Sequence, residues 1–77
     1  MTRRYNILLT WDPSDRVWVS CVPSLDWIST FGETRKEAIE RTREAVLGFI
    51  EAAAKEGLDI APGDGEAELA AVEVSAP

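Results

Sequence analysis

The stretch GETRKEA, residues 32–38, marks the point at which strand-like sequence gives way to helical sequence. Thr34 has the properties of a helix N-cap, since its hydroxyl can accept a hydrogen bond from a backbone N–H of the first turn. Glu37 stands three residues later and can reach back to the Thr34 N–H, which would complete a capping box. Gly32 permits a backbone angle that most residues avoid. We therefore expect a helix to begin at Arg35.

The residues that follow have the periodicity of an amphipathic helix, which we expect to span 35–56. Its apolar stripe consists of Ala38, Ile39, Thr42, Ala45, Val46, Phe49, Ile50 and Ala53. Gly57 suits the position just after the helix, and Leu58 can close back onto the last turn. Gly48 within the helix costs about 1 kcal/mol relative to alanine. We expect this glycine to allow close approach of a strand or of a second subunit.

The residues before the stretch read as three strands. Residues 4–11 and 16–22 alternate in hydrophobicity, as half-buried strands do, and the short turn between them predicts an antiparallel hairpin. Pro23 cannot donate to a ladder and should end the second strand. A loop to Trp27 then leads into a third short strand over 28–31.

The residues after the helix predict a loop and a final strand. Leu69, Val72 and Val74 are the strongest apolar positions there, and we expect a fourth strand over 69–74. The fold class is therefore α+β: a single domain over residues 1–77 with the order β-β-β-α-β, in which one long helix packs on one face of a small, antiparallel-rich sheet.

Composition limits the chemistry available to this chain. It has 77 residues, one cysteine and no histidine, so the usual protein ligands and bases for zinc, haem or thiol–imidazole chemistry are missing. We expect no catalytic residues, no metal and no cofactor. Cys21 is interpreted as a small buried apolar residue rather than a reactive thiol.

The charge is unevenly distributed. Residues 1–50 carry seven acidic and seven basic side chains, whereas residues 51–77 carry seven acidic side chains and one lysine. The net charge of −6 therefore lies in the C-terminal third, which argues against non-specific nucleic-acid binding. Two interpretations remain: the acidity keeps a small protein soluble, or it attracts a basic protein partner. Arg3 and Arg4, near the chain end, are expected to be solvated.

The N-terminus does not read as a signal peptide, because the apolar run after the first arginines is short and ends at Asp12-Pro13. No stretch approaches the roughly 20 apolar residues of a membrane span. We expect a cytoplasmic protein that does not interact with membranes.

The order of these signals resembles the HicB antitoxins. Tyr5 lies in a first strand, and the second strand ends in Val22-Pro23-x-Leu25. Gly32-x-Thr34-x-x-Glu37-Ala38 and a second Glu-Ala pair at 44–45 then follow. The similarity covers roughly residues 5 to 62 and implies a partial RNase H-like domain. Two features depart from the family pattern: Asp26-Trp27 replaces the usual Pro-Gly, and the sequence ends at Pro77, before the DNA-binding module of many members.

The resemblance implies a non-catalytic protein that binds and neutralises a HicA-type toxin. Such toxins are small, basic, mRNA-cleaving ribonucleases with a double-stranded-RNA-binding-like fold and an active-site histidine. The alternative is an orphan regulatory or self-associating domain without a toxin. An open sheet edge and a small core also predict a homodimer or a higher oligomer.

The candidate partner-binding residues are aromatic or acidic: Trp18, Trp27, Asp26, Glu66 and Glu68. Trp11 is expected to pack in the core. Trp18, on the strand face opposite Val17 and Val19, should be exposed to solvent or to a partner. Trp27 either contacts a partner or subunit or closes the end of the core.

A metal-dependent RNase H-like nuclease is the competing enzymatic interpretation, since that chemistry holds two metal ions on clustered carboxylates. Its candidates are Asp12, Asp15, Glu37 and Glu40. A structural interpretation is favoured for all four: the two aspartates lie in a turn, Glu37 caps the helix, and Glu40 lies on its charged face.

Overall fold

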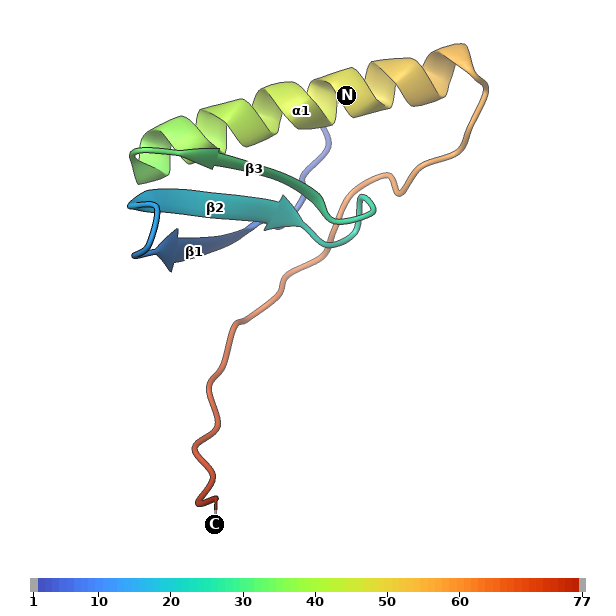
Figure 1. Ribbon diagram of the computed structural model, residues 1–77. Helices are drawn as coiled ribbons and strands as arrows, with labels where there is room; N and C mark the ends of the chain where they lie inside the picture. Colours follow the sequence, from blue (N-terminus) through green and yellow to red (C-terminus); the bar gives the residue numbers. More distant parts are fainter. Residues whose placement is uncertain (1, 77) are drawn as a thin grey trace.

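Three short strands and one long helix follow one another in the computed structural model, which describes residues 2–76 (Figure 1). The elements are β1 (Leu8–Asp12), β2 (Val17–Val22), β3 (Ile28–Gly32) and α1 (Arg35–Lys55). The three strands form an antiparallel sheet in the order β1-β2-β3, and α1 packs across β3 and β2 on one face.

β1 begins later than the sequence predicts, at Leu8 rather than near residue 4. The ladder pairs Leu8 with Cys21, so the same register would place Pro23 opposite Asn6. Because Pro23 has no N–H to donate, the pairing ends before that point. Residues 4–6 instead hydrogen-bond to the C-terminal segment.

The register assigns each strand residue to one of two faces. The face that meets α1 carries Leu9, Trp11, Trp18, Ser20, Val22, Ile28, Thr30 and Gly32. The open face carries Leu8, Thr10, Asp12, Val17, Val19, Cys21, Ser29 and Phe31. The helix therefore covers the face of Trp18, and the expectation that Trp18 lies on an uncovered face is wrong.

Gly32 and Ser20 set how closely the helix approaches the sheet. A Cβ atom on Gly32 would lie 2.5 Å from the backbone nitrogen of Ala38, so only glycine fits beneath the first turn of α1. Gly32 has no positive φ, and its role is close packing rather than an unusual backbone angle. Ser20 is buried and its hydroxyl meets that of Thr42 on α1.

The N-terminus of α1 is capped by half of the predicted capping box. The Glu37 backbone N–H donates to Thr34 Oγ1 over 3.1 Å, as expected of an N-cap threonine. The Glu37 carboxylate does not return to the Thr34 N–H; its Oε1 pairs with the Arg41 guanidinium at 3.0 Å. The reciprocal bond predicted for Glu37 is therefore replaced by an i,i+4 ion pair.

The C-terminus of α1 closes as predicted. Gly57 adopts a φ of +69°, and its N–H donates to the carbonyl of Ala54. The Leu58 N–H donates to the carbonyl of Ala53 over 2.9 Å. Both bonds belong to a Schellman motif, which satisfies carbonyls left free at the helix end.

The hydrophobic core is small. Every residue of the predicted apolar stripe of α1 is buried or half-buried. Among residues 2–76, however, the buried hydrophobic residues are only Val22, Leu25, Ala38 and Ala53. Large apolar side chains remain exposed, so much apolar surface is left for other contacts.

The predicted fourth strand is wrong: residues 58–76 contain no helix or strand. Leu69, Val72 and Val74 are 84%, 84% and 80% exposed, so nothing buries the side chains on which that prediction depended. After residue 65 the segment runs away from the domain (Figure 1). It raises the radius of gyration to 14.9 Å, whereas a compact chain of this length has about 11 to 12 Å.

Candidate partner-binding surface

The loop between β2 and β3 consists of two consecutive tight turns. The Leu25 N–H donates to the Val22 carbonyl over 3.1 Å, and the Ile28 N–H donates to the Leu25 carbonyl over 3.2 Å. Leu25 is shared by both turns and is only 2% exposed, so it anchors the loop to the core. The tip of the second turn, Asp26-Trp27, is left in solvent.

Trp27 occupies a backbone conformation that tryptophan normally avoids. Asp26 and Trp27 both have a φ of +56°, the positive angle that type I′ turns require at their two central positions. Left-handed backbone costs an L-residue about 1–2 kcal/mol, and glycine is the usual residue there. Trp27 is nevertheless 62% exposed, so burial of its ring does not offset the strain. Of the two roles predicted for Trp27, closing the core is therefore wrong.

The C-terminal segment is tied to this loop through Asp64. One carboxylate oxygen of Asp64 accepts from the Asn6 N–H at 2.8 Å and from the Ser24 hydroxyl at 3.0 Å. The Asp64 N–H donates to the Arg4 carbonyl, and Asn6 Nδ2 donates to the Gly65 carbonyl. We call this set of contacts the Asp64 clasp.

The clasp brings the β2–β3 loop and the start of the C-terminal segment together at one end of the sheet. Because Ser24 bonds to Asp64, the loop that carries Asp26 and Trp27 is joined to the segment that leads into Glu66 and Glu68. Both glutamates are exposed. We call the surface formed by Asp26, Trp27 and Asp64 the acidic loop end; it combines two carboxylates with one exposed indole ring, and Glu66 and Glu68 follow it along the chain.

Trp18 is not part of the acidic loop end. It lies near the start of β2, at the hairpin end of the sheet, whereas the acidic loop end follows the end of that strand (Figure 1). Its ring packs against that of Trp11, with centroids 5.6 Å apart and planes tilted by 59°. Trp11 is 44% exposed, so the prediction that it is a core residue is wrong.

The four carboxylates considered for a nuclease are held in other local contacts or point into solvent. Asp12 Oδ1 accepts from the Ser14 and Asp15 N–H groups of the hairpin turn. Glu37 pairs with Arg41, and Glu40 is exposed on α1. Among residues 2–76, no three His, Cys, Asp or Glu side chains lie close enough together to hold a metal ion.

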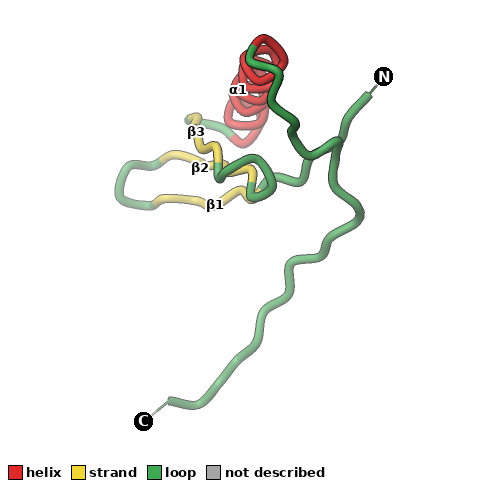
Figure 2. Tube along the Cα trace, turned by 90° about the vertical axis from the view of Figure 1, so that its right-hand side faces the viewer, coloured by secondary structure: helices red, strands yellow, loops and turns green. Residues whose placement is uncertain are grey.

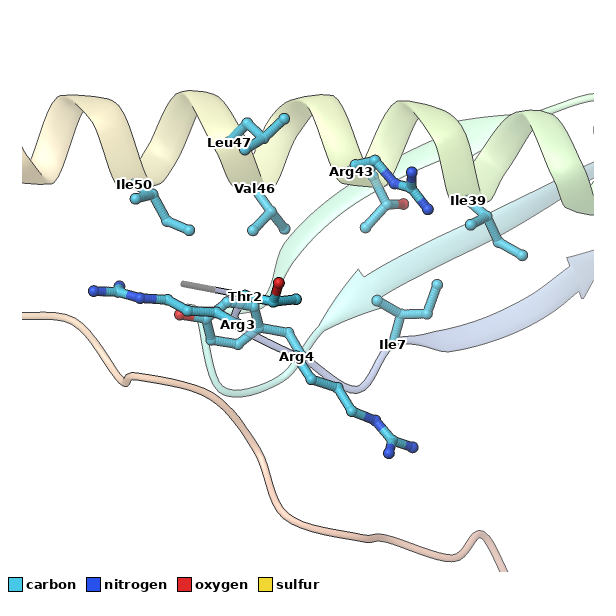
Figure 3. Close-up of a pocket in the computed structure, with 11 residues that line it drawn as sticks. Thr2, Arg3, Arg4, Ile7, Ile39, Arg43, Val46, Leu47 and Ile50 are labelled. Atoms are coloured by element: carbon cyan, nitrogen blue, oxygen red, sulfur yellow. The ribbon is translucent and has the colours of Figure 1, made fainter.

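A second surface feature is an apolar groove of about 960 Å³ between α1 and the N-terminal segment (Figure 3). It exists because α1 covers β3 and β2, and the N-terminal segment before β1 stays apart from the helix. Apolar side chains line it from both sides: Tyr5, Ile7, Ile39, Val46, Leu47 and Ile50. Thr2, Arg3, Arg4, Thr42 and Arg43 complete its lining. We call it the N-terminal groove.

The open face of the sheet is the third uncovered surface. Phe31 is 56% exposed there, and the Arg41 guanidinium reaches over the edge of β3 to lie 5.7 Å from its ring centroid. Arg41 also donates to the Phe31 carbonyl over 3.0 Å. Cys21 is half-buried on this face rather than buried as predicted, and its thiol lies 3.9 Å from the Leu8 carbonyl.

Sequence reasoning missed Asp64 and the N-terminal groove. Asp64 resembles any other acidic residue in a Gly-rich loop, since its partners Asn6 and Ser24 are distant in sequence. The sequence contained part of the information needed to predict the groove. Ile39, Val46 and Ile50 lie toward one side of the apolar stripe of α1, and the stripe is wider than the surface that β3 can cover.

Gly48 has no packing role within the domain. A Cβ atom at Gly48 would find no atom within 4 Å, so the expected close approach of a strand is wrong. Its alternative, a contact with a second subunit, stays a prediction.

Among residues 2–76, α1 lacks the long apolar stretch with which a helix could cross a bilayer. Comparisons of the chain with protein-family models, with curated proteins and with solved structures find no match.

Proposed function

We propose that this protein is a non-catalytic antitoxin of the HicB type, which binds and neutralises a small, basic, mRNA-cleaving HicA-type ribonuclease. The acidic loop end is the contact surface. The observation that carries the proposal is Trp27, an exposed tryptophan held in a strained left-handed turn next to Asp26. Strain retained at an exposed position is typical of functional residues, because packing gains nothing from it.

The chemistry of the acidic loop end matches such a partner. Exposed tryptophans are frequent binding hot spots, since one large ring can fill a pocket on the other protein. The carboxylates of Asp26 and Asp64 at this end of the sheet, followed along the chain by those of Glu66 and Glu68, attract a basic surface and raise its rate of association. Inhibition of this kind needs complementary shape and charge, and it needs no reactive group in the inhibitor.

The fold supports the proposal in its coarse features. The order of three antiparallel strands followed by one long helix agrees with the resemblance inferred from the Pro-x-Leu and Gly-x-Thr-x-x-Glu-Ala segments. Each segment has a structural role in this chain. Leu25 anchors the strained loop to the core, and Gly32 and Thr34 form the turn that begins the helix.

Titration against a small basic HicA-type ribonuclease encoded beside this gene tests the proposal. We expect submicromolar binding and loss of RNA cleavage at equimolar ratio, with affinity that falls as salt is raised. The Trp27→Ala variant should bind at least tenfold more weakly. Phe31→Ala is the matched control, because it removes an aromatic ring of similar exposure from a different face. No binding at micromolar concentration would contradict the proposal.

A second candidate is an orphan regulatory domain that acts by self-association. The observation in its favour is the amount of uncovered apolar surface in the N-terminal groove and on the open face of the sheet. The two candidates differ in one measurement: an orphan domain would bind no ribonuclease while forming an oligomer on its own.

A further inference from the structure

Two features of this chain complement one another, and within a single copy they do not contact each other. One is the N-terminal groove; the other is the extended segment over residues 66–74, which we call the tail. We propose that the tail of one copy docks in the N-terminal groove of a second copy, so that two copies exchange their tails. This proposal does not rest on the proposed function.

The groove has the form of a docking site for an extended apolar segment. Figure 3 shows Val46 and Ile50 pointing from α1 toward the N-terminal segment, with Ile7 and Ile39 facing the same space. Leu47 is 53% exposed beside them. A groove of about 960 Å³ has room for several aliphatic side chains.

The tail supplies side chains of the right kind. Leu69, Val72 and Val74 are each at least 80% exposed, which makes them the most exposed large hydrophobic residues among residues 2–76. A segment of this composition exposes apolar surface that a partner can bury. Its backbone is extended and forms no ladder, so it can adapt to a groove.

Charge complementarity selects this pairing. The tail carries Glu66, Glu68 and Glu73 and no basic residue. The groove lining carries Arg3, Arg4 and Arg43 and no acidic residue. Three carboxylates on an apolar segment thus match three guanidinium groups around an apolar groove, and opposite charges of this kind fix orientation and discriminate against other partners.

The Asp64 clasp explains why the tail enters a second copy rather than its own groove. Asp64 and Gly65 are bonded to Arg4 and Asn6, so the direction of the chain is set just before the tail begins. From there the tail runs away from α1, and the views in Figures 1 and 2 agree on this. To reach its own groove, the chain would have to turn back just after Gly65, against the direction that the clasp gives it (Figure 1).

Exchange of tails between two copies fills the grooves of both copies. If the tail of each copy lies in the groove of the other, the contact is made twice about a two-fold axis, as in most homodimers. The small core provides a reason for such an arrangement, because a domain with few buried apolar residues is stabilised by association.

Sedimentation or light scattering of the full chain over a range of concentrations tests the proposal. We expect a dimer for the native sequence and a monomer for Leu69→Asp/Val72→Asp. Those two side chains lie in solvent in the single copy, so the double variant leaves the domain folded, which circular dichroism verifies. Phe31→Asp, on the open face, is the matched control and should remain a dimer.

A charge exchange makes the test specific to the two surfaces. Glu66→Arg/Glu68→Arg/Glu73→Arg should weaken the dimer at least tenfold, and so should Arg3→Glu/Arg4→Glu/Arg43→Glu. An equimolar mixture of the two variants should restore the dimer as a heterodimer, because each tail then meets a groove of opposite charge.

Three results would overturn the proposal. The native chain could be a monomer at every concentration. If Leu69→Asp/Val72→Asp then also lowered the stability of that monomer, the tail would lie in its own groove. The dimer could survive Leu69→Asp/Val72→Asp. Phe31→Asp could dissociate the dimer while the tail variant does not, which would assign the interface to the open face of the sheet. None of these results bears on ribonuclease binding by the acidic loop end.

Discussion

Ser20 on β2 and Thr42 on α1 form a buried hydroxyl pair at the contact between sheet and helix. The Thr42 hydroxyl donates to the Ala38 carbonyl over 2.7 Å, so the Ser20 hydroxyl is the donor in the pair. Both residues are almost inaccessible to solvent, at 0% and 3% exposure. No buried polar side-chain atom is left without a hydrogen-bond partner among residues 2–76. At the contact between sheet and helix, the two hydroxyls satisfy one another.

Removing one member of the pair should cost more than removing both. Thr42→Val leaves the Ser20 hydroxyl buried without an acceptor, and we expect a loss of about 1–3 kcal/mol in the free energy of unfolding. The double variant Ser20→Ala/Thr42→Val replaces both groups by apolar ones and should recover most of that loss. Urea denaturation of the single and double variants measures the coupling. If the loss in the double variant equalled the sum of the losses in Ser20→Ala and Thr42→Val, the predicted coupling between the two hydroxyls would be contradicted.

Gly32 and Gly48 should respond in opposite directions to alanine. The Cβ atom of Gly32→Ala would lie 2.5 Å from one backbone atom and 2.9 Å from another in the first turn of α1, so the helix must shift. We expect a loss of about 1–3 kcal/mol. Gly48→Ala meets no atom within 4 Å and should gain about 0.5–1 kcal/mol from helix propensity. Thermal unfolding at one protein concentration compares them.

A stability gain in Gly48→Ala should leave self-association intact if Gly48 lies outside any interface. Loss of the oligomer in this variant would show that the glycine serves a subunit contact, the alternative that the sequence left open.

Trp27 should show opposing effects on stability and on binding. In Trp27→Gly, the positive φ is no longer strained, and we expect the domain to be stabilised by about 1 kcal/mol. Trp27→Ala loses the same ring and keeps the strain, so the difference between the two variants isolates the backbone contribution. Chemical denaturation measures this difference. Equal stability of the two variants would contradict strain at this position.

The Asp64 clasp should hold residues 61–65 against the N-terminal segment. Asp64→Ala removes the acceptor for Asn6 and Ser24, and we expect a loss of about 1 kcal/mol and faster cleavage of this segment by a protease. Asp59→Ala, an exposed carboxylate of the same segment outside the clasp and the tail, is the matched control and should leave both measurements unchanged. Equal cleavage rates in the two variants would contradict the role of Asp64.

Local sequence patterns determined most of the secondary structure. The threonine cap, the eight-residue apolar stripe and the Gly57 stop defined α1 to within one residue, because helices are specified by short-range spacing and by capping. The hairpin and the third strand follow from period-two alternation and from Pro23, which has no N–H for a ladder.

Local patterns were insufficient to predict which of the two faces of the sheet α1 covers. The alternation in β2 is apolar on both sides, so spacing alone could not show that the helix covers the face of Trp18, Ser20 and Val22. The space beside Gly32 and the Ser20–Thr42 pair made that choice. The same ambiguity placed Trp11 in the core, where the structure leaves it beside Trp18 at the edge of the covered face.

The sequence by itself determined the elements, their order and the uneven charge, since each depends on residues close together along the chain. Tertiary structure decided the rest. It left residues 69–74 without a strand partner, tied Asp64 to Asn6 and Ser24 across the chain, and opened a groove beside α1. Each of these outcomes depends on which distant backbone or side-chain groups meet in space, and spacing along one segment does not contain that information.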